Sequence, residues 1–297
     1  MDNLIRKIDL HIHHMDNELT DVVDKMHSTG TTVVALSKLD EDISSILLKQ
    51  AKSTGRRFIA DEAGIVFKDA DQDYCIFFAT EHNTLFRDTG LVLHLLTWGG
   101  GGLQAVPYMD TEALIRRALD AGIIPNLDHP LVANRGTLTM GHITKEEQGY
   151  VLEIGKEFGP NAPWELNGYC VPGLRRRLLP VLKVSGRGKN AMYYDVNKEV
   201  EGIVAGSEGN LRMIAATDLH ARSVGDLNLI GTAHINAVLT GYYPREIRES
   251  LRQRIIKGNN DYTNTLRYVP PTHIVKSYAS FIVAASLERQ LERLRPA

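Results

Sequence analysis

The sequence predicts an α/β protein built on a closed barrel of strands and helices. Short apolar, β-branched runs alternate with helix-like segments along the chain, and repeated alternation of this kind is typical of parallel sheets and βα barrels. We expect about seven such units before residue 240, which favours a barrel over an open sheet. The length of 297 residues fits one barrel with an extension.

Hydrophobic periodicity places the individual elements. Leu19, Val22, Val23 and Met26 recur at spacings near three and four, as on one face of a helix. The expected strands are residues 8–13, 32–36, 57–62, 91–96, 123–127, 164–166, 212–217 and 235–239, and residues 65–67 with 74–80 suggest a hairpin. The expected helices are residues 18–28, 40–52, 111–121 and 145–158, and a segment that begins at Pro244 and ends before Gly258.

The pattern changes near residue 243. Residues 259–268 are polar and rich in turn formers, and residues 277–294 predict a last helix. We therefore expect a barrel domain over residues 1–242 and a helical extension over residues 243–297 that packs on the barrel or on a partner. Residues 185–210 predict a long loop with a short helix.

Composition excludes several classes of protein. There are 34 Lys and Arg against 36 Asp and Glu, a net charge of −2, which argues against a nucleic-acid coat driven by bulk charge. Two cysteines, Cys75 and Cys170, cannot form a disulfide framework. No apolar run approaches the twenty or so residues of a membrane span, and the N-terminus lacks signal-peptide features. We expect a cytoplasmic protein without a membrane partner.

Histidines and carboxylates gather at the predicted strand ends. His11 and His13 close the first strand two residues apart, so both side chains point to the same face. The same placement recurs at Glu62, His94, His129, Glu165, Asn167, Asp218 and His220. The carboxyl ends of barrel strands form one rim, where active sites lie. Imidazoles with carboxylates suit Zn²⁺, Mn²⁺ or Fe²⁺, and a shared carboxylate would join two such ions.

These motifs, in their order, resemble the PHP family, named for polymerase and histidinol phosphatase. They are D-L-H-I-H, A-D-E-A-G, V-L-H-L-L, L-D-H-P, W-E-L-N and A-T-D-L-H, and they span roughly residues 5–235. The resemblance implies a distorted, seven-stranded, TIM-like barrel with phosphoesterase activity and two or three metal ions. It implies that His11, His13, Glu62 and Asp218 hold a first metal, that Glu62 bridges to a second metal held by His94 and His129, and that His220 serves a third.

One departure from the family concerns the third metal. The second strand is followed by L-S-K-L-D, residues 36–40, where family members carry a histidine. The third site is then empty, rebuilt from Asp40 with Asp16 or Glu18, or replaced by the charge of Lys38. We expect two metals, with Lys38 or an arginine beside the substrate phosphate.

Other polar residues are candidates for substrate binding or support. Arg135 and Arg222 follow His129 and His220 closely, and an arginine fork suits a phosphate. Glu165 and Asn167 could orient a ligand histidine, and His234 is either a supporting or a structural residue. The glycines Gly99–Gly102 form an anion nest, a hinge or a lid.

The expected function is hydrolysis of a phosphate ester by a metal-bridging hydroxide. A small-molecule ester is favoured over a nucleic-acid end because the net charge is near zero. Two alternatives stay open: an amidohydrolase-type enzyme, which also begins with H-x-H, and a degenerate, non-catalytic binding module. The lack of a candidate metal-bridging lysine on a central strand argues against the first.

Overall fold

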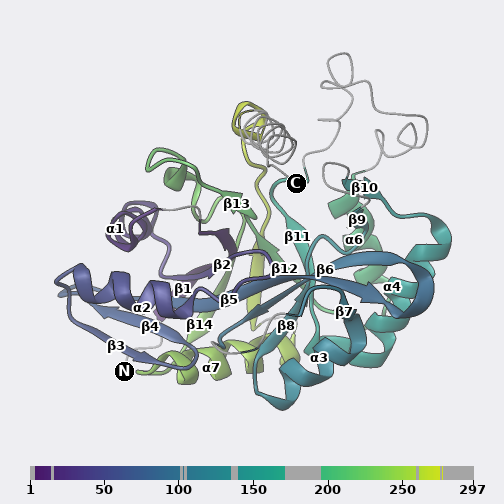
Figure 1. The fold of residues 1–297 in the computed structure, drawn as a ribbon, viewed down its shortest axis with the longest axis horizontal. Coiled ribbons are helices and arrows are strands. Elements are labelled where there is room, and N and C mark those ends of the chain that lie inside the picture. The colour runs from purple at the N-terminus through teal and green to yellow at the C-terminus, as the bar shows by residue number, and fades with distance from the viewer. Residues whose placement is uncertain are drawn as a thin grey trace, which may run out of the picture.

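The protein has a mixed α/β fold in which one large sheet curls into a nearly closed barrel (Figure 1). The structure is a computed structural model that describes residues 4–14, 17–100, 103, 106–134, 140–170, 195–258, 261–274 and 276. Across the sheet the strands run β12 (Met213–Ala216), β11 (Trp164–Asn167), β8 (Ile124–Leu127), β6 (Leu91–Trp98), β5 (Asp73–Phe86), β2 (Val33–Ser37), β1 (Leu4–His13), β14 (His234–Leu239) and β15 (Tyr262–Thr265). The expected alternation of strands and helices is confirmed at this level.

Strand β1 brings the two ends of the sheet together. Its first half pairs with β14, with Ile8 opposite Ile235. Its last residues pair instead with β13 (Leu219–His220), which follows β12 after two residues. Ile12 lies opposite Leu219 in this short parallel pair. The carboxyl ends of β1 and β12 are therefore neighbours, although the two strands lie far apart in the sheet order.

Strand direction departs from a uniformly parallel barrel. Strand β6 runs antiparallel to both β5 and β8. The reason is the connection: η1 (Arg87–Thr89) is too short to carry the chain back across the sheet, and a parallel crossover needs a dozen or more residues. The hairpin of β4 (Gly64–Lys68) with β5 is present as expected. It is extended by β3 (Phe58–Asp61), which pairs only with β4 and is not a strand of the barrel path.

Two smaller pairings complete the strands. Strand β7 (Met109–Asp110) lies beside the end of β5, and β9 (Val132–Asn134) pairs with β10 (Met140–His142).

Helices cover the barrel on its outside and at one end. Helices α1 (Leu19–Thr29) and α2 (Ser44–Ser53) pack on the β1–β2 side, as Figure 1 shows, and α3 (Thr111–Asp120), α4 (Lys145–Phe158) and α6 (Val196–Ala205) pack on the opposite side. The short turn η2 (Gly159–Asn161) connects α4 to β11, and η5 (Asp226–Leu229) lies between β13 and β14. Helix α7 (Pro244–Lys257) inserts Leu251 and Ile255 into the core beneath Ile8 and Trp98.

A β-bulge in β1 decides which side chains face the interior. Asp9 lies opposite Val34, and Ile12 lies opposite Leu36. Strand β1 therefore has one more residue than β2 over this interval. Before the bulge, Leu10 faces the inner core; after it, Ile12 packs outward against the helices. His11 therefore points to the same inner side as Leu10.

Asp9 holds the bulge in place from the outer side. Its carboxylate accepts hydrogen bonds from the backbone N–H and hydroxyl of Thr217 and from the N–H of Gly231. Burial raises the pKa of this carboxyl, although these hydrogen bonds oppose the shift.

The C-terminal segment is only partly the helical extension that the sequence predicts. Helix α7 begins at Pro244 as expected, but residues 262–265 form β15, which joins the main sheet beside β14. Val269 then donates a hydrogen bond to the carbonyl of Gly168 at the end of β11. The segment thus runs from one end of the barrel to the other. The expected helix over residues 277–294 lies outside the described residues.

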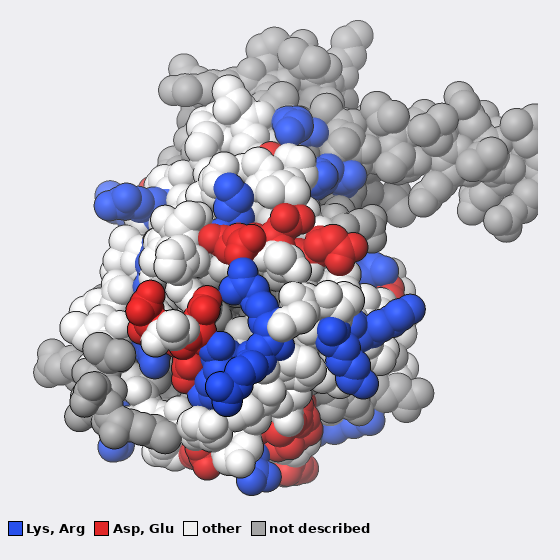
Figure 2. Space-filling model, turned by 90° about the vertical axis from the view of Figure 1, so that its left-hand side faces the viewer, with Lys and Arg blue, Asp and Glu red and all other residues white. Residues whose placement is uncertain are grey.

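Charges of both signs share the face drawn in Figure 2, where basic and acidic side chains lie beside one another. Arg56, three residues after α2, pairs with Asp24 of α1 and Asp69 after β4.

Within the described residues, none of the helices has the length and apolar character that crossing a bilayer requires.

Candidate metal centre

Buried histidines and carboxylates converge where β1, β8, β11 and β12 end. Within the described residues, three groups of such side chains could each hold a metal ion. They are Glu81 with His94, Asp128 and His129; His11 with His13 and Asp218; and His11 with Asp128 and Glu165. The groups share members, so they form one continuous cluster.

Four side chains form what we call the first set: Asp218, His11, His13 and His220. The three histidines surround one oxygen of Asp218. Its Oδ1 lies 3.5 Å from His11 Nε2, 3.1 Å from His13 Nε2 and 3.3 Å from His220 Nε2. The rings of His13 and His220 are stacked, with their centroids 3.9 Å apart. The sequence predicts these four residues as ligands, and the structure brings them together. His220, expected at a separate third metal, lies in this set.

The second set consists of Glu81 in β5, His94 in β6, and Asp128 and His129 in the loop after β8. His94 Nδ1 contacts Glu81 Oε1 and lies 4.0 Å from Asp128 Oδ2. The same Asp128 oxygen lies 3.1 Å from His129 Nε2. His94 and His129 are predicted from the sequence, and the two carboxylates are not.

Glu81 links the two sets. One of its oxygens contacts His94, and the other lies 3.4 Å from His13 Nε2. The backbone of the β2 end fixes this residue: the Glu81 N–H donates to the carbonyl of Lys38, and the Asp40 N–H donates to the carbonyl of Glu81. A carboxylate held this way can bridge two cations.

Backbone strain accompanies the strand ends. His129 has φ 30° and Asp218 has φ 56°, both in the region that residues other than glycine seldom adopt. Such conformations cost about 1–3 kcal/mol each and collect at functional sites.

The side chains present fit a pair of divalent cations. Within the described residues, His94 Nε2 is buried without a hydrogen-bond partner, and His11 Nε2 and Asp128 Oδ2 are buried with only an ion-pair neighbour that does not form a well-aligned hydrogen bond. Buried polar atoms are seldom left so, because each costs roughly 1–3 kcal/mol. Imidazole nitrogens and carboxylate oxygens are donors that Zn²⁺, Mn²⁺ and Fe²⁺ accept.

Without an ion, the cluster balances its charges with protons. Burial lowers the pKa of His129, but the neighbouring carboxylate of Asp128 outweighs burial and raises this pKa to about 10. Burial raises the pKa of Asp128, and the charges of His129 and His11 outweigh it and hold the pKa well below its ordinary value. Cations bound here would replace such protons.

Glu165 and Asn167 lie behind the first set. His11 Nδ1 lies 3.1 Å from Glu165 Oε2, an arrangement that leaves Nε2 of the same ring facing Asp218. Asn167 Nδ2 donates to Glu165 Oε1 at 2.8 Å. Burial, and then the charge of Asp128, raise the pKa of Glu165 to about 8. Glu165 thus contacts His11, and Asn167 contacts Glu165; their supporting role stays a prediction.

Glu62 is not part of the cluster, and the expectation that it bridges two metals is corrected here. It is exposed in the turn between β3 and β4, and its charge acts on Arg248 of α7 instead. The cause is the β3–β4 hairpin. The strand that ends at Glu62 in the prediction corresponds to β3, which pairs with β4 and lies off the barrel path. The carboxylate that reaches both sets is Glu81.

The remaining candidate residues that the structure describes have partners outside the cluster. Lys38 is exposed, and its Nζ pairs with Glu41 at 2.6 Å. Arg222 is exposed, and its backbone N–H donates to Asp226. His234 Nδ1 donates a hydrogen bond to the Gly231 carbonyl, and within the described residues it makes none to the cluster. Arg135 lies outside the described residues.

No candidate residue for a rebuilt third site joins the cluster within the described part of the chain. Asp40 accepts hydrogen bonds from the backbone and side chain of Asn83, and Glu18 is exposed before α1. Asp16 lies outside the described residues.

The first glycines of the Gly99–Gly102 run have a packing role. Gly99 has φ +79°, and a Cβ there would lie 2.3 Å from Arg248 Cδ of α7. A Cβ on Gly100 would lie 2.3 Å from Ile123 Cδ1. These contacts lie after β6, beside the helix that covers the other end of the barrel, and not at the metal-ligand cluster.

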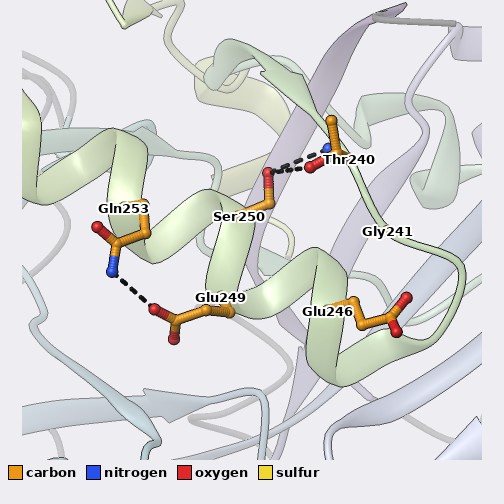
Figure 3. Close-up of a pocket in the computed structure, with 6 residues that line it drawn as sticks. All are labelled: Thr240, Gly241, Glu246, Glu249, Ser250 and Gln253. Carbon is orange, nitrogen blue, oxygen red and sulfur yellow. Dashed lines mark hydrogen bonds between the residues drawn. The ribbon is translucent and has the colours of Figure 1, made fainter. Parts of the chain in front are cut away.

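A surface groove beside α7 carries no comparable chemistry (Figure 3). Its polar groups bond to one another: Thr240 to Ser250, and Gln253 to Glu249.

Comparisons with known proteins leave the chain without an assigned family. No family model matches the sequence, and no curated protein matches it. Among the solved structures that match, a "putative metal-dependent phosphoesterase" from Bifidobacterium adolescentis superposes with a TM-score of 0.42 at 10% identity, over 73% of this chain and 88% of that one. A likeness of this extent transfers neither fold nor function.

Proposed function

We propose that this chain is a metal-dependent phosphoesterase that hydrolyses a small-molecule phosphate ester at a centre of two divalent cations. The observation that carries the proposal is Glu81, whose two oxygens face His94 on one side and His13 on the other. The motif resemblance to the PHP family supplies the reaction class. Divalent cations bound there would lower the pKa of a water and neutralise charge on a phosphate.

The protein's own residues hold and shape the site. His11, His13, Asp218 and His220 would hold one cation, and Glu81, His94, Asp128 and His129 the other, with Glu81 shared. Most of these ligands are buried and exclude water from one side of the site. The side chains of Asp218 and His220 are 11% and 20% exposed, so the site is open to solvent at these two residues. Substrate would therefore approach from the His220 side.

Arg222 is our candidate for the substrate phosphate. It is exposed and lies two residues beyond His220, and a guanidinium can donate two parallel hydrogen bonds to one phosphate. Lys38 and Arg135 remain further candidates for the same role.

The bridging residue favours a phosphoesterase over the amidohydrolase alternative. In the described part of the chain, the ion-pair partners of Glu81, Asp128 and Asp218 are all histidines. The sequence offers no candidate lysine bridge on a central strand, and the position between the two sets is taken by a glutamate.

The test measures metal content and substrate class together. Protein purified without a histidine tag or chelator is assayed for metals by elemental analysis, and then with Mn²⁺, Zn²⁺ or Fe²⁺ against phosphate monoesters, phosphate diesters and cyclic amides. We expect about two equivalents of metal and turnover of phosphate esters alone. Turnover of amides alone would contradict the proposal, and the absence of metal uptake would favour the non-catalytic module.

A further inference from the structure

The side-chain amide of Asn167 lies among three carboxylates of the cluster. Its Nδ2 donates to Glu165 Oε1 at 2.8 Å, to Asp218 Oδ2 at 3.0 Å and, more weakly, to Asp128 Oδ1 at 3.4 Å. An amide nitrogen carries only two protons, so the two shorter contacts take most of its donor capacity.

These contacts divide the oxygens of each carboxylate between two tasks. Asp218 gives Oδ2 to Asn167 and turns Oδ1 toward the histidines of the first set. Asp128 gives Oδ1 to Asn167 and turns Oδ2 toward His129. One oxygen of Asp218 is thereby occupied, and the other faces the place for a cation. The contact to Asp128 Oδ1 is the weakest of the three, and this oxygen also lies 3.5 Å from His11 Nδ1.

The orientation of the amide is itself fixed by its surroundings. Its oxygen accepts the N–H of Tyr169 at 2.7 Å, so the nitrogen must face the carboxylates. The backbone of Asn167 is held on both sides by Asn197 of α6: Asn197 Oδ1 accepts the Asn167 N–H at 2.8 Å, and Asn197 Nδ2 donates to the Asn167 carbonyl at 2.9 Å. Asn197 itself is buried and contacts none of the candidate ligands in the described structure.

We propose that Asn167, anchored by Asn197, is a positioning residue that makes Asp218 offer a single oxygen to the metals. The inference rests on the proposed function only for the presence of metals. It assigns α6 a part in metal affinity although the helix supplies no ligand. A neutral amide suits this task because it restrains carboxylates without adding a charge that would compete with cations.

Cobalt binding tests the inference without any assay of turnover. Chelator-stripped wild type, Asn167→Ala and Asn197→Ala are titrated with Co²⁺ in competition with a chromophoric chelator, and their visible absorption is recorded. Without the amide, Asp218 is free to offer both oxygens, which raises the coordination number and weakens the absorption of Co²⁺. We expect Asn167→Ala to bind Co²⁺ about 10–100-fold more weakly. Asn197→Ala should shift the spectrum and affinity in the same direction by less.

A matched control is Asn236→Ala, which removes an amide that bonds to Thr265 between β14 and β15. It should keep the wild-type affinity and spectrum. Circular dichroism of the metal-free proteins checks folding, and if Asn167→Ala does not fold, Asn197→Ala decides alone. Wild-type spectra and affinities in the folded Asn variants would overturn the inference while leaving the proposed function intact. Failure of the wild type to bind Co²⁺ would overturn both.

Discussion

Glu81 and His94 are diagonal neighbours across the antiparallel β5–β6 pair. Glu81 lies opposite Leu96, two residues beyond His94, so the two side chains share one face of the sheet and meet there. The reversed direction of β6 creates this pairing. In a uniformly parallel barrel these two residues would come from strands joined by a long crossover.

The first prediction concerns the bridging role of Glu81. Glu81→Gln keeps the size of the side chain but removes the charge that faces both sets. We expect the variant to retain at most one equivalent of metal and to lose at least about 100-fold in phosphoesterase turnover, since both cations depend on this carboxylate. Elemental analysis and steady-state kinetics measure the two effects.

Glu62→Gln is the matched control, because the sequence alone assigns this role to Glu62 and the structure leaves it exposed. It should match the wild type in both measurements. A loss of metal in Glu62→Gln with a normal Glu81→Gln would reverse our assignment.

The second prediction concerns Arg222. If its guanidinium binds the substrate phosphate, Arg222→Ala loses a hydrogen bond between charged groups, worth about 1.5–3 kcal/mol. We expect the KM for a phosphate monoester to rise about 10–100-fold with unchanged metal content. Arg222→Lys should recover only part of the loss, because an ammonium does not offer the two-pronged geometry.

Arg252→Ala serves as the comparison, since this arginine lies on α7 and pairs with Glu249. An unchanged KM in Arg222→Ala would assign the phosphate to another cation, such as Lys38 or Arg135.

The third prediction concerns Gly99. A methyl group there meets the side chain of Arg248 and places alanine at φ +79°. We expect Gly99→Ala to lower the free energy of unfolding by about 1–3 kcal/mol while metal content stays normal. Urea denaturation measures the loss.

Gly90→Ala separates strain from overlap, because Gly90 has φ +73° but open space around its Cα. It should cost only about 1 kcal/mol. Combining Gly99→Ala with Arg248→Ala should restore part of the stability, and additive losses would exclude the overlap as the cause.

The fourth prediction concerns pH and Asp226. Burial raises the pKa of this carboxyl, but a hydrogen bond from Ser223 and the charges of His273 and Lys276 outweigh burial and lower the pKa below 3.8. A carboxyl whose pKa is lower in the folded state stabilises the fold above its unfolded pKa and loses this contribution as the pH falls through the folded one. Asp226→Asn should therefore be less stable than the wild type at pH 7.

The difference between Asp226→Asn and wild type should shrink as the pH falls below about 4. Urea denaturation of both proteins at several pH values measures it. A difference that is constant with pH would show that packing, not charge, is responsible.

Much of the fold and part of the cluster follow from the sequence because they depend on local patterns. The H-x-H pair and the D-x-H pair sit at strand ends, and strand alternation fixes which side chains share a face. Thus His11, His13, Asp218 and His220 are predicted together and lie together.

The two missing carboxylates depend on features that no local pattern shows. Glu81 lies inside the long strand β5, which continues past the end of its neighbour β2 for several more residues. A signal was present nonetheless: Glu81 directly follows the predicted strand over residues 74–80, which is the same placement as that of the other candidate ligands. Asp128 precedes His129 directly, and the L-D-H-P motif by itself does not distinguish the two residues as ligands.

The bulge in β1 has a consequence for engineering and for natural variation of this protein. At the bulge, the alternation of inward and outward side chains shifts by one residue while the strand continues. The inward side chains are apolar up to Leu10 and are imidazoles from His11 onward. In a regular strand of the same sequence, Leu10 and Ile12 would share one face, and His11 and His13 would share the opposite face with Asp9. The bulge therefore allows one strand to place an apolar side chain and two imidazoles on the same inner side, and a change that regularises the strand without shortening it would remove both histidines from the centre.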